Sequence, residues 1–163
     1  MSRPRTPVRK RHRANAPLPK FWRPKLTPSG VLDCQVIHWD LVTRFASGTA
    51  ELGDLIDWIE TGYTYAEMLR LLLADGLQIT PEAQATMAAL LDSFDALLQR
   101  YLDTGRAIFT GPELQAARAA AQVMDEIAAS DRHGIGLKAA LWSCERMKAI
   151  NATHQPAQRE QQP

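Results

Sequence analysis

The sequence contains few cysteines and no long apolar run, and these two scarcities exclude several classes of protein. Its two cysteines, Cys34 and Cys144, lie in segments of helical pattern and lack the Cys-x-x-Cys spacing of zinc and redox sites. We expect buried, reduced thiols, and a disulfide between the two is the alternative. No apolar run approaches the roughly 18 residues that a membrane span needs. We therefore expect a cytoplasmic protein that has no membrane contact.

We also expect no targeting signal at the start of the chain. The basic N-terminus is not followed by the apolar segment of a secretory signal. It contains Pro4, Pro7, Pro17 and Pro19, and such repeated proline disfavours the amphipathic helix of a transit peptide. The sequence thus gives no reason to place the protein outside the cytoplasm.

No motif of catalysis or metal binding stands out. The histidines are scattered as His12, His38, His133 and His154, and none has a partner at a recognised ligand spacing. Within His38-Trp39-Asp40, neighbouring residues of a helix point in different directions, so we expect a surface or half-buried histidine there, and a ligand or general base is the alternative. Phosphate loops and Gly-x-Ser-x-Gly elbows are absent. We expect no enzymatic activity, no metal and no cofactor.

Charge is strongly segregated along the chain. Nine of the 19 lysines and arginines lie in residues 1–25, which contain no acid, so the remaining ten face all 18 acidic residues and give the body a charge of −8. Such asymmetry indicates a polyanionic partner. We expect nucleic-acid contacts from this arm, at Arg3, Arg5, Arg9, Lys10, Arg11, Arg13, Lys20, Phe21, Trp22, Arg23 and Lys25. Phe21 and Trp22 have two interpretations, because they can stack on bases or dock the arm onto the body.

The rest of the chain has the apolar spacing of amphipathic helices. The strongest signal runs from Thr80 to Tyr101, where Thr80 and Pro81 start a helix and apolar residues recur every three or four positions. Gly48, Gly62, Gly76 and Gly105 are predicted to end helices. Thr49, Thr64 and Thr110 are predicted to cap helix starts, the last two with Glu67 and Glu113 in capping boxes. The predicted helices span about 30–46, 50–61, 64–75, 81–103, 112–132 and 136–150.

These features predict an all-α fold, a single compact domain of about six helices around a long antiparallel hairpin of residues 81–103 and 112–132. Residues 1–28 are expected to form a basic, proline-rich flexible arm, residues 29–150 the helical domain and residues 151–163 a disordered tail. In the last helix we expect Leu137, Ala140, Leu141, Cys144 and Met147 to point inward.

Surface features allow more than one interpretation. Glu51, Asp54, Asp57 and Glu60 form a row that we interpret as a solvated helix side, with imitation of nucleic acid or contact with a basic partner as the alternative. Trp39, Trp58 and Trp142 lie on or beside predicted apolar faces, so we expect core packing. An exposed tryptophan would instead favour an interface, because tryptophan dominates binding hot spots.

Several short segments resemble a loose group of small, uncharacterised helical proteins encoded by phages and prophages of proteobacteria. They are the Arg- and Pro-rich start ending in WRPKL, the early Trp39, FASGTAELGDLIDW and the capped helix after FTGPEL. The resemblance implies an accessory protein in the cytoplasm of a bacterial host cell and carries no functional residue. Three functions follow as hypotheses: nucleic-acid binding through the arm, protein binding by an inhibitor or assembly factor through the acidic body, or attachment of the arm to a larger particle.

Overall fold

The protein is all-α. The computed structural model describes residues 26–159, with side chains described for residues 26–150. Six helices follow one another: α1 (Pro28–Ser47), α2 (Leu52–Ala74), α3 (Pro81–Asp92), α4 (Phe94–Thr104), α5 (Gly111–Ala129) and α6 (Ile135–Arg159). Extended pairing within this range is limited to an isolated antiparallel bridge between Ala50 and Ala107. The predicted fold class is confirmed.

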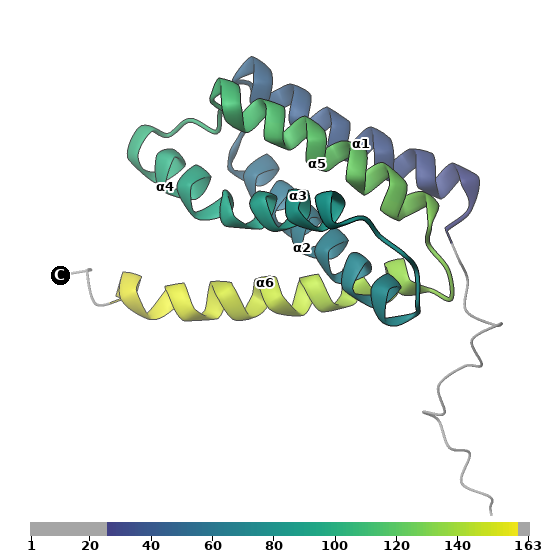
Figure 1. Ribbon diagram of the computed structural model, residues 1–163. Coiled ribbons are helices and arrows are strands. Elements are labelled where there is room, and N and C mark those ends of the chain that lie inside the picture. Colours follow the sequence, from purple (N-terminus) through teal and green to yellow (C-terminus); the bar gives the residue numbers. More distant parts are fainter. Residues whose placement is uncertain (1–25, 160–163) are drawn as a thin grey trace, which may run out of the picture.

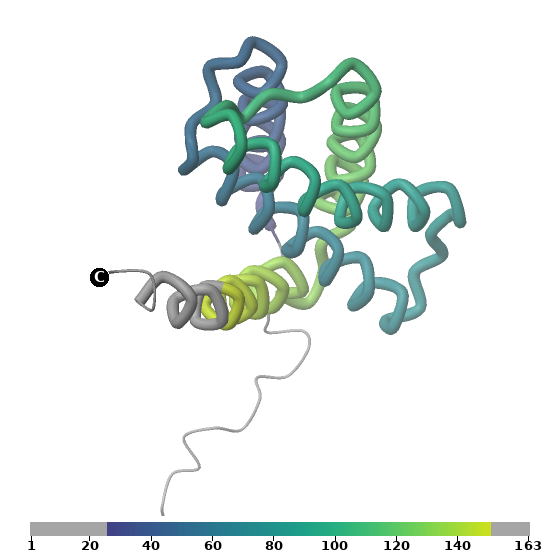
Figure 2. Tube along the Cα trace, turned by 90° about the vertical axis from the view of Figure 1, so that its left-hand side faces the viewer, coloured from purple at the N-terminus to yellow at the C-terminus, as the bar shows by residue number. Residues whose placement is uncertain are grey.

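Two antiparallel helix pairs flank α3 (Figure 1). The pair α1–α5 lies along one side of the molecule and the pair α2–α6 along the other (Figure 1). Cross-helix contacts fix the directions. In the first pair Leu26 bonds to Asp131 and His38 to Asp125, and in the second pair Glu60 bonds to Cys144 and Thr64 to Ser143. The helix α3 packs on both α5 and α2, and it crosses α5 at a steep angle (Figure 2).

An aromatic cluster forms the centre of the core near the start of α2. Phe45 and Trp58 are fully buried, and the ring of Phe109 stacks on Phe45 at 4.6 Å between centroids. Phe109 belongs to the loop between α4 and α5, so this cluster connects three parts of the chain. Burying such rings provides the largest single contributions to the hydrophobic free energy of folding.

Several predicted helix boundaries are confirmed. Thr80 accepts a hydrogen bond from the Ala83 amide at 3.2 Å, and Thr110 forms a capping box with Glu113. Gly48 and Gly105 adopt the left-handed conformation after α1 and α4. At Thr27 and Pro28, the same Thr-Pro signal starts α1 two residues before the predicted position. The boundary assigned to the arm, residue 28, therefore lies in α1.

Gly62 does not end a helix, and this prediction was wrong. The chain stays helical from Leu52 to Ala74, so the two helices predicted around residues 50–61 and 64–75 are one. A Cβ atom on Gly62 would lie 2.3 Å from Cζ of Phe94. The glycine is there because the Phe94 ring packs directly against the helix backbone.

The predicted caps next to this helix also differ from the structure. The cap of α2 is Glu51 with Asp54 rather than Thr49. The hydroxyl of Thr64 donates to the Glu60 carbonyl oxygen, and Glu67 pairs with Arg70, so neither residue caps a helix start. Thr and Ser hydroxyls commonly make such bonds inside helices, where the sequence alone gives the same signal as a cap.

The long predicted helix is interrupted at Ser93. The hydroxyl of Ser93 donates to the Leu90 carbonyl oxygen at 2.6 Å, and α4 starts at the next residue. A serine hydroxyl that bonds back to a carbonyl of the preceding turn competes with the helical ladder and bends it. The interruption places Phe94 against Gly62.

The inward face of α6 was also predicted wrongly in part. Leu137 and Leu141 are each 61% exposed and Cys144 is exposed, whereas Ile135, Ala139 and Ser143 are buried. Small side chains face α2 because the helices lie close together. The backbone of α6 continues past residue 150 to Arg159, into the segment predicted as a tail.

Candidate functional site

The residues predicted to bind nucleic acid all lie outside the described part of the chain. They are Arg3, Arg5, Arg9, Lys10, Arg11, Arg13, Lys20, Phe21, Trp22, Arg23 and Lys25, and the structure begins at Leu26. Leu26 itself is anchored, because its amide donates to Oδ2 of Asp131 at 2.7 Å. The arm therefore joins the body beside the start of α6, where Asp131 also accepts from the Gly136 amide.

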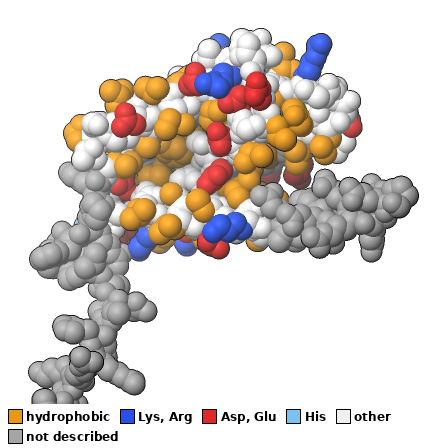
Figure 3. Space-filling model, turned by 180° about the vertical axis from the view of Figure 1, so that it is seen from behind, with side chains coloured by type: hydrophobic (Ala, Val, Ile, Leu, Met, Phe, Trp, Pro, Cys, Tyr) orange, Lys and Arg blue, Asp and Glu red, His pale blue; other side chains and the backbone are white. Residues whose placement is uncertain are grey.

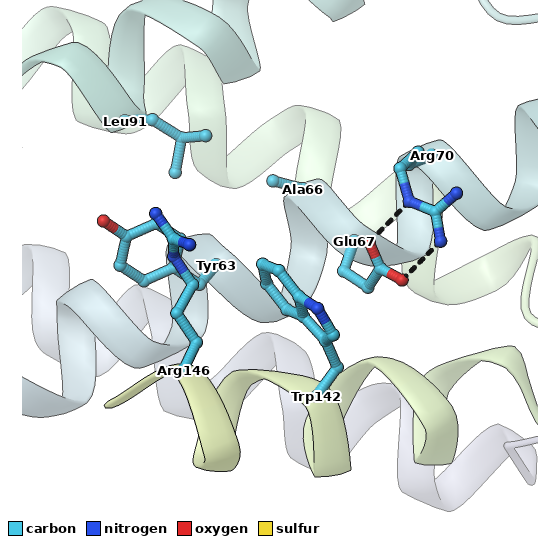
Figure 4. A pocket seen from close by; sticks show the side chains of 7 residues that line it. All are labelled: Tyr63, Ala66, Glu67, Arg70, Leu91, Trp142 and Arg146. Atoms are coloured by element: carbon cyan, nitrogen blue, oxygen red, sulfur yellow. Dashed lines mark hydrogen bonds and ion pairs between the residues drawn. The ribbon is translucent and has the colours of Figure 1, made fainter. Parts of the chain in front are cut away.

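A groove lies between α2, α3 and α6, and we call it the Trp142 groove. It has a volume of about 500 Å³. Its lining residues are Tyr63, Ala66, Glu67 and Arg70 from α2, Leu91 from α3, and Trp142 and Arg146 from α6 (Figure 4). Trp142 is 41% exposed, so the expectation that this side chain packs in the core is wrong.

Local packing holds the rings of the Trp142 groove in place. The rings of Tyr63 and Trp142 meet edge to face at 6.5 Å between centroids, and the rings of Tyr63 and Phe94 meet edge to face at 5.8 Å. Cζ of Arg146 lies 4.7 Å from the Tyr63 ring centroid and 5.6 Å from that of Trp142. The guanidinium of this exposed residue thus makes cation–π contacts with both rings.

The second arginine of the groove is already neutralised. Arg70 donates two hydrogen bonds of 2.7 Å to the two carboxylate oxygens of Glu67, one turn earlier on α2 (Figure 4). Arg146 is different, because it forms no ion pair among the residues whose side chains are described. The groove therefore combines an apolar floor, two aromatic rings and one cation with available donors.

A buried polar cluster lies between α1 and α5. His38 is 0% exposed, and its Nε2 lies 2.7 Å from Oδ1 of Asp125, whose Oδ2 accepts from the Trp39 indole at 3.1 Å. The expectation of a surface or half-buried His38 is therefore wrong, and the side chains of His38 and Trp39 both bond to the carboxylate of Asp125. A carboxylate only accepts, so Nε2 of His38 carries the hydrogen. The cluster is closed to solvent on the histidine side and connects two helices.

Burial lowers the pKa of His38, partly opposed by its hydrogen bond to Asp125. The groups that face it are Asp125 from α5 and, from α2, Tyr65, whose pKa burial raises. A histidine that resists protonation only in the folded state makes the protein less stable as the pH falls through about 6.5, the unfolded value.

We therefore expect the free energy of unfolding to fall between pH 7.5 and pH 5.5, and this fall to be smaller in His38→Gln. Each unit of pKa difference corresponds to about 1.4 kcal/mol. Urea unfolding at several pH values measures the slope. The same slope in both proteins would contradict the assignment, because the variant retains the other three histidines.

The remaining candidate residues are the two cysteines and the row of acidic residues. Cys34 and Cys144 are both free thiols, so no disulfide joins them, but Cys34 is only half-buried and Cys144 is exposed, so the expected burial is wrong. Sγ of Cys144 donates to Oε1 of Glu60 at 3.1 Å. In the acidic row, Glu51 and Asp57 are exposed, as a solvated side requires, while Asp54 pairs with Arg44. Across the described residues, no group of three or more His, Cys, Asp and Glu side chains could hold a metal ion.

None of the helices in residues 26–159 combines the length and apolar character that crossing a membrane requires. Comparison with known proteins gives no relative: no family model matches the chain, and no curated protein or solved structure is similar enough to match.

Proposed function

We propose that the chain is a small non-enzymatic accessory protein, encoded by a phage or prophage, that binds nucleic acid through its basic arm. The observation that carries this proposal is the segregation of charge, with nine cations and no acid in residues 1–25. A cationic segment neutralises phosphates and releases counterions, which favours binding without much sequence preference. The helical body then acts as a folded platform.

The ion pairs of the body support this division of roles. Arg44, Arg100 and Lys148 pair with Asp40, Glu113 and Glu145, and Arg70 and Arg132 are paired as well. On the face drawn in Figure 3, basic side chains are scattered and form no continuous basic patch. Paired cations add little to the attraction of a polyanion, and beyond residue 25 the 18 acidic residues outnumber the ten basic ones, so the arm is the main source of that attraction.

Fluorescence anisotropy of labelled single- and double-stranded DNA and RNA tests the proposal. We compare the full chain with a chain that begins at Leu26, at low salt. We expect binding by the full chain and a loss of at least tenfold in affinity without residues 1–25, since most counterion release is then removed. Binding that survives removal of the arm, or no binding by either protein, would refute the proposal.

Protein binding is the second candidate function, as in a phage-encoded inhibitor of a host system or an assembly factor. One specific observation favours it: Trp142 is exposed in a groove together with Tyr63 and two arginines. Tryptophan, tyrosine and arginine are the side chains most enriched at the hot spots of protein interfaces. This candidate uses the body, whereas nucleic-acid binding uses the arm, so both activities can be tested separately.

A further inference from the structure

We propose that the Trp142 groove docks a short peptide segment of a partner protein, one that carries an apolar anchor next to an acidic side chain. The inference rests on protein binding, the second candidate function, and specifies the chemistry of the partner. It does not depend on the arm, because every residue of the groove lies between Tyr63 and Arg146.

The shape of the groove suits an aliphatic or aromatic side chain. Ala66 and Leu91 provide an apolar surface opposite Trp142, and Tyr63 closes one end (Figure 4). The planes of the two aromatic rings are inclined by 70°, so they form an angled recess instead of a flat platform. Three helices hold these side chains, and such fixed aromatic walls keep the entropic cost of binding low.

The charge of the groove specifies the neighbour of that anchor. Glu67 already accepts both hydrogen bonds of Arg70, so this pair is neutral as a unit. The guanidinium of Arg146 stays charged and is oriented by the two rings beneath it. A carboxylate is its complementary partner, because guanidinium binds carboxylates through two parallel hydrogen bonds.

A nucleic acid fits the groove less well than a peptide. Bases bind by stacking on open ring faces, and here Arg146 lies over both rings. The chain beyond residue 25 has ten basic and 18 acidic residues, which repel a polyphosphate more strongly than a single carboxylate. The groove therefore favours a peptide with one acidic residue over an oligonucleotide.

The test selects ligands from a random peptide library displayed on phage, with the full-length protein as the target. We expect enriched sequences that share one large apolar residue and at least one Asp or Glu within a few positions. A synthetic peptide of the enriched sequence should bind about 30-fold more weakly to Trp142→Ala, the effect of removing a hot spot of about 2 kcal/mol. We expect Arg146→Gln to weaken peptide binding about tenfold. In that variant, replacing the acidic residue of the peptide should cause no further loss of affinity.

Leu141→Ala is the matched control, since Leu141 neighbours Trp142 on α6, is 61% exposed and does not line the groove. Thermal unfolding of each variant shows whether it still folds. Trp142→Leu serves as a second variant that removes the indole but keeps a large apolar side chain. No enriched peptide, enrichment without acidic residues, or equal binding by Trp142→Ala would overturn the proposal. So would displacement of the peptide by an oligonucleotide that requires Trp142. Nucleic-acid binding through the arm would stand or fall separately in the anisotropy experiment.

Discussion

Gly62→Ala is expected to reduce the free energy of unfolding by about 1–3 kcal/mol, the usual cost of forcing atoms into a packed core. Alanine is normally favoured over glycine inside a helix by about 1 kcal/mol, so the direction is opposite to that of helix propensity. The physical reason is the 2.3 Å approach that a Cβ atom would make to Cζ of Phe94. Equilibrium unfolding in urea, followed by circular dichroism, measures the change.

The control for this substitution is Gly53→Ala in the first turn of the same helix. A Cβ atom at Gly53 would meet nothing within 4 Å, so we expect unchanged stability or a gain of up to about 1 kcal/mol. If Gly62→Ala is as stable as the native protein, Phe94 does not pack on α2 as described. The junction at Ser93 would then need a different explanation.

Asp125→Ala is expected to cost about 2–4 kcal/mol of stability. The substitution leaves the buried His38 and the indole of Trp39 without an acceptor, and each buried donor that loses its partner costs about 1–3 kcal/mol. Asp125→Asn keeps one acceptor oxygen, so we expect a smaller loss. Thermal and urea unfolding at pH 7.5 measure both variants.

Glu126→Ala is the control for Asp125→Ala, because Glu126 is the next acidic residue of α5 and is exposed. Substitutions at the surface usually change the free energy of unfolding by no more than about 0.5 kcal/mol. Equal stabilities of Asp125→Ala and Glu126→Ala would show that the polar cluster contributes nothing. Asp125→Ala is also expected to shift the pH dependence of stability, because the hydrogen bond from Asp125 partly offsets the lowering of the His38 pKa by burial.

The class of the fold could be predicted from sequence because helix boundaries are local. Thr80 and Pro81 start a helix, and Gly105 ends one, through bonds to residues within one turn. Gly62 was misinterpreted because a glycine signals two different things, a helix end or a close contact. Only the position of Phe94, which is 32 residues away in the chain, decides between them.

The candidate site was harder to predict than the fold. The Trp142 groove gathers side chains from three helices, and the order of helices in the sequence does not reveal which ones become neighbours. The apolar period of α6 suggested that Leu137 and Leu141 are buried, yet its contact with α2 uses Ala139 and Ser143. A local signal did exist: Trp142 and Arg146 are one helical turn apart, a spacing that brings side chains together.

The polar cluster had an equally indirect signal. His38 lies on the apolar face of α1, where burial is expected of any residue, but its acceptor Asp125 is 87 positions away. A single sequence does not connect two such positions. Partners that lie far apart in the chain therefore escape prediction even where each helix is predicted well.

The salt dependence of nucleic-acid binding by the full chain tests the central proposal most directly. Each phosphate neutralised on double-stranded DNA contributes about −0.9 to the slope of log K against log salt. Nine arm cations set a limit of about −8, and we predict a slope between about −3 and −8 that disappears in a chain beginning at Leu26. A slope near zero, or one that is unchanged without residues 1–25, would contradict binding through the arm.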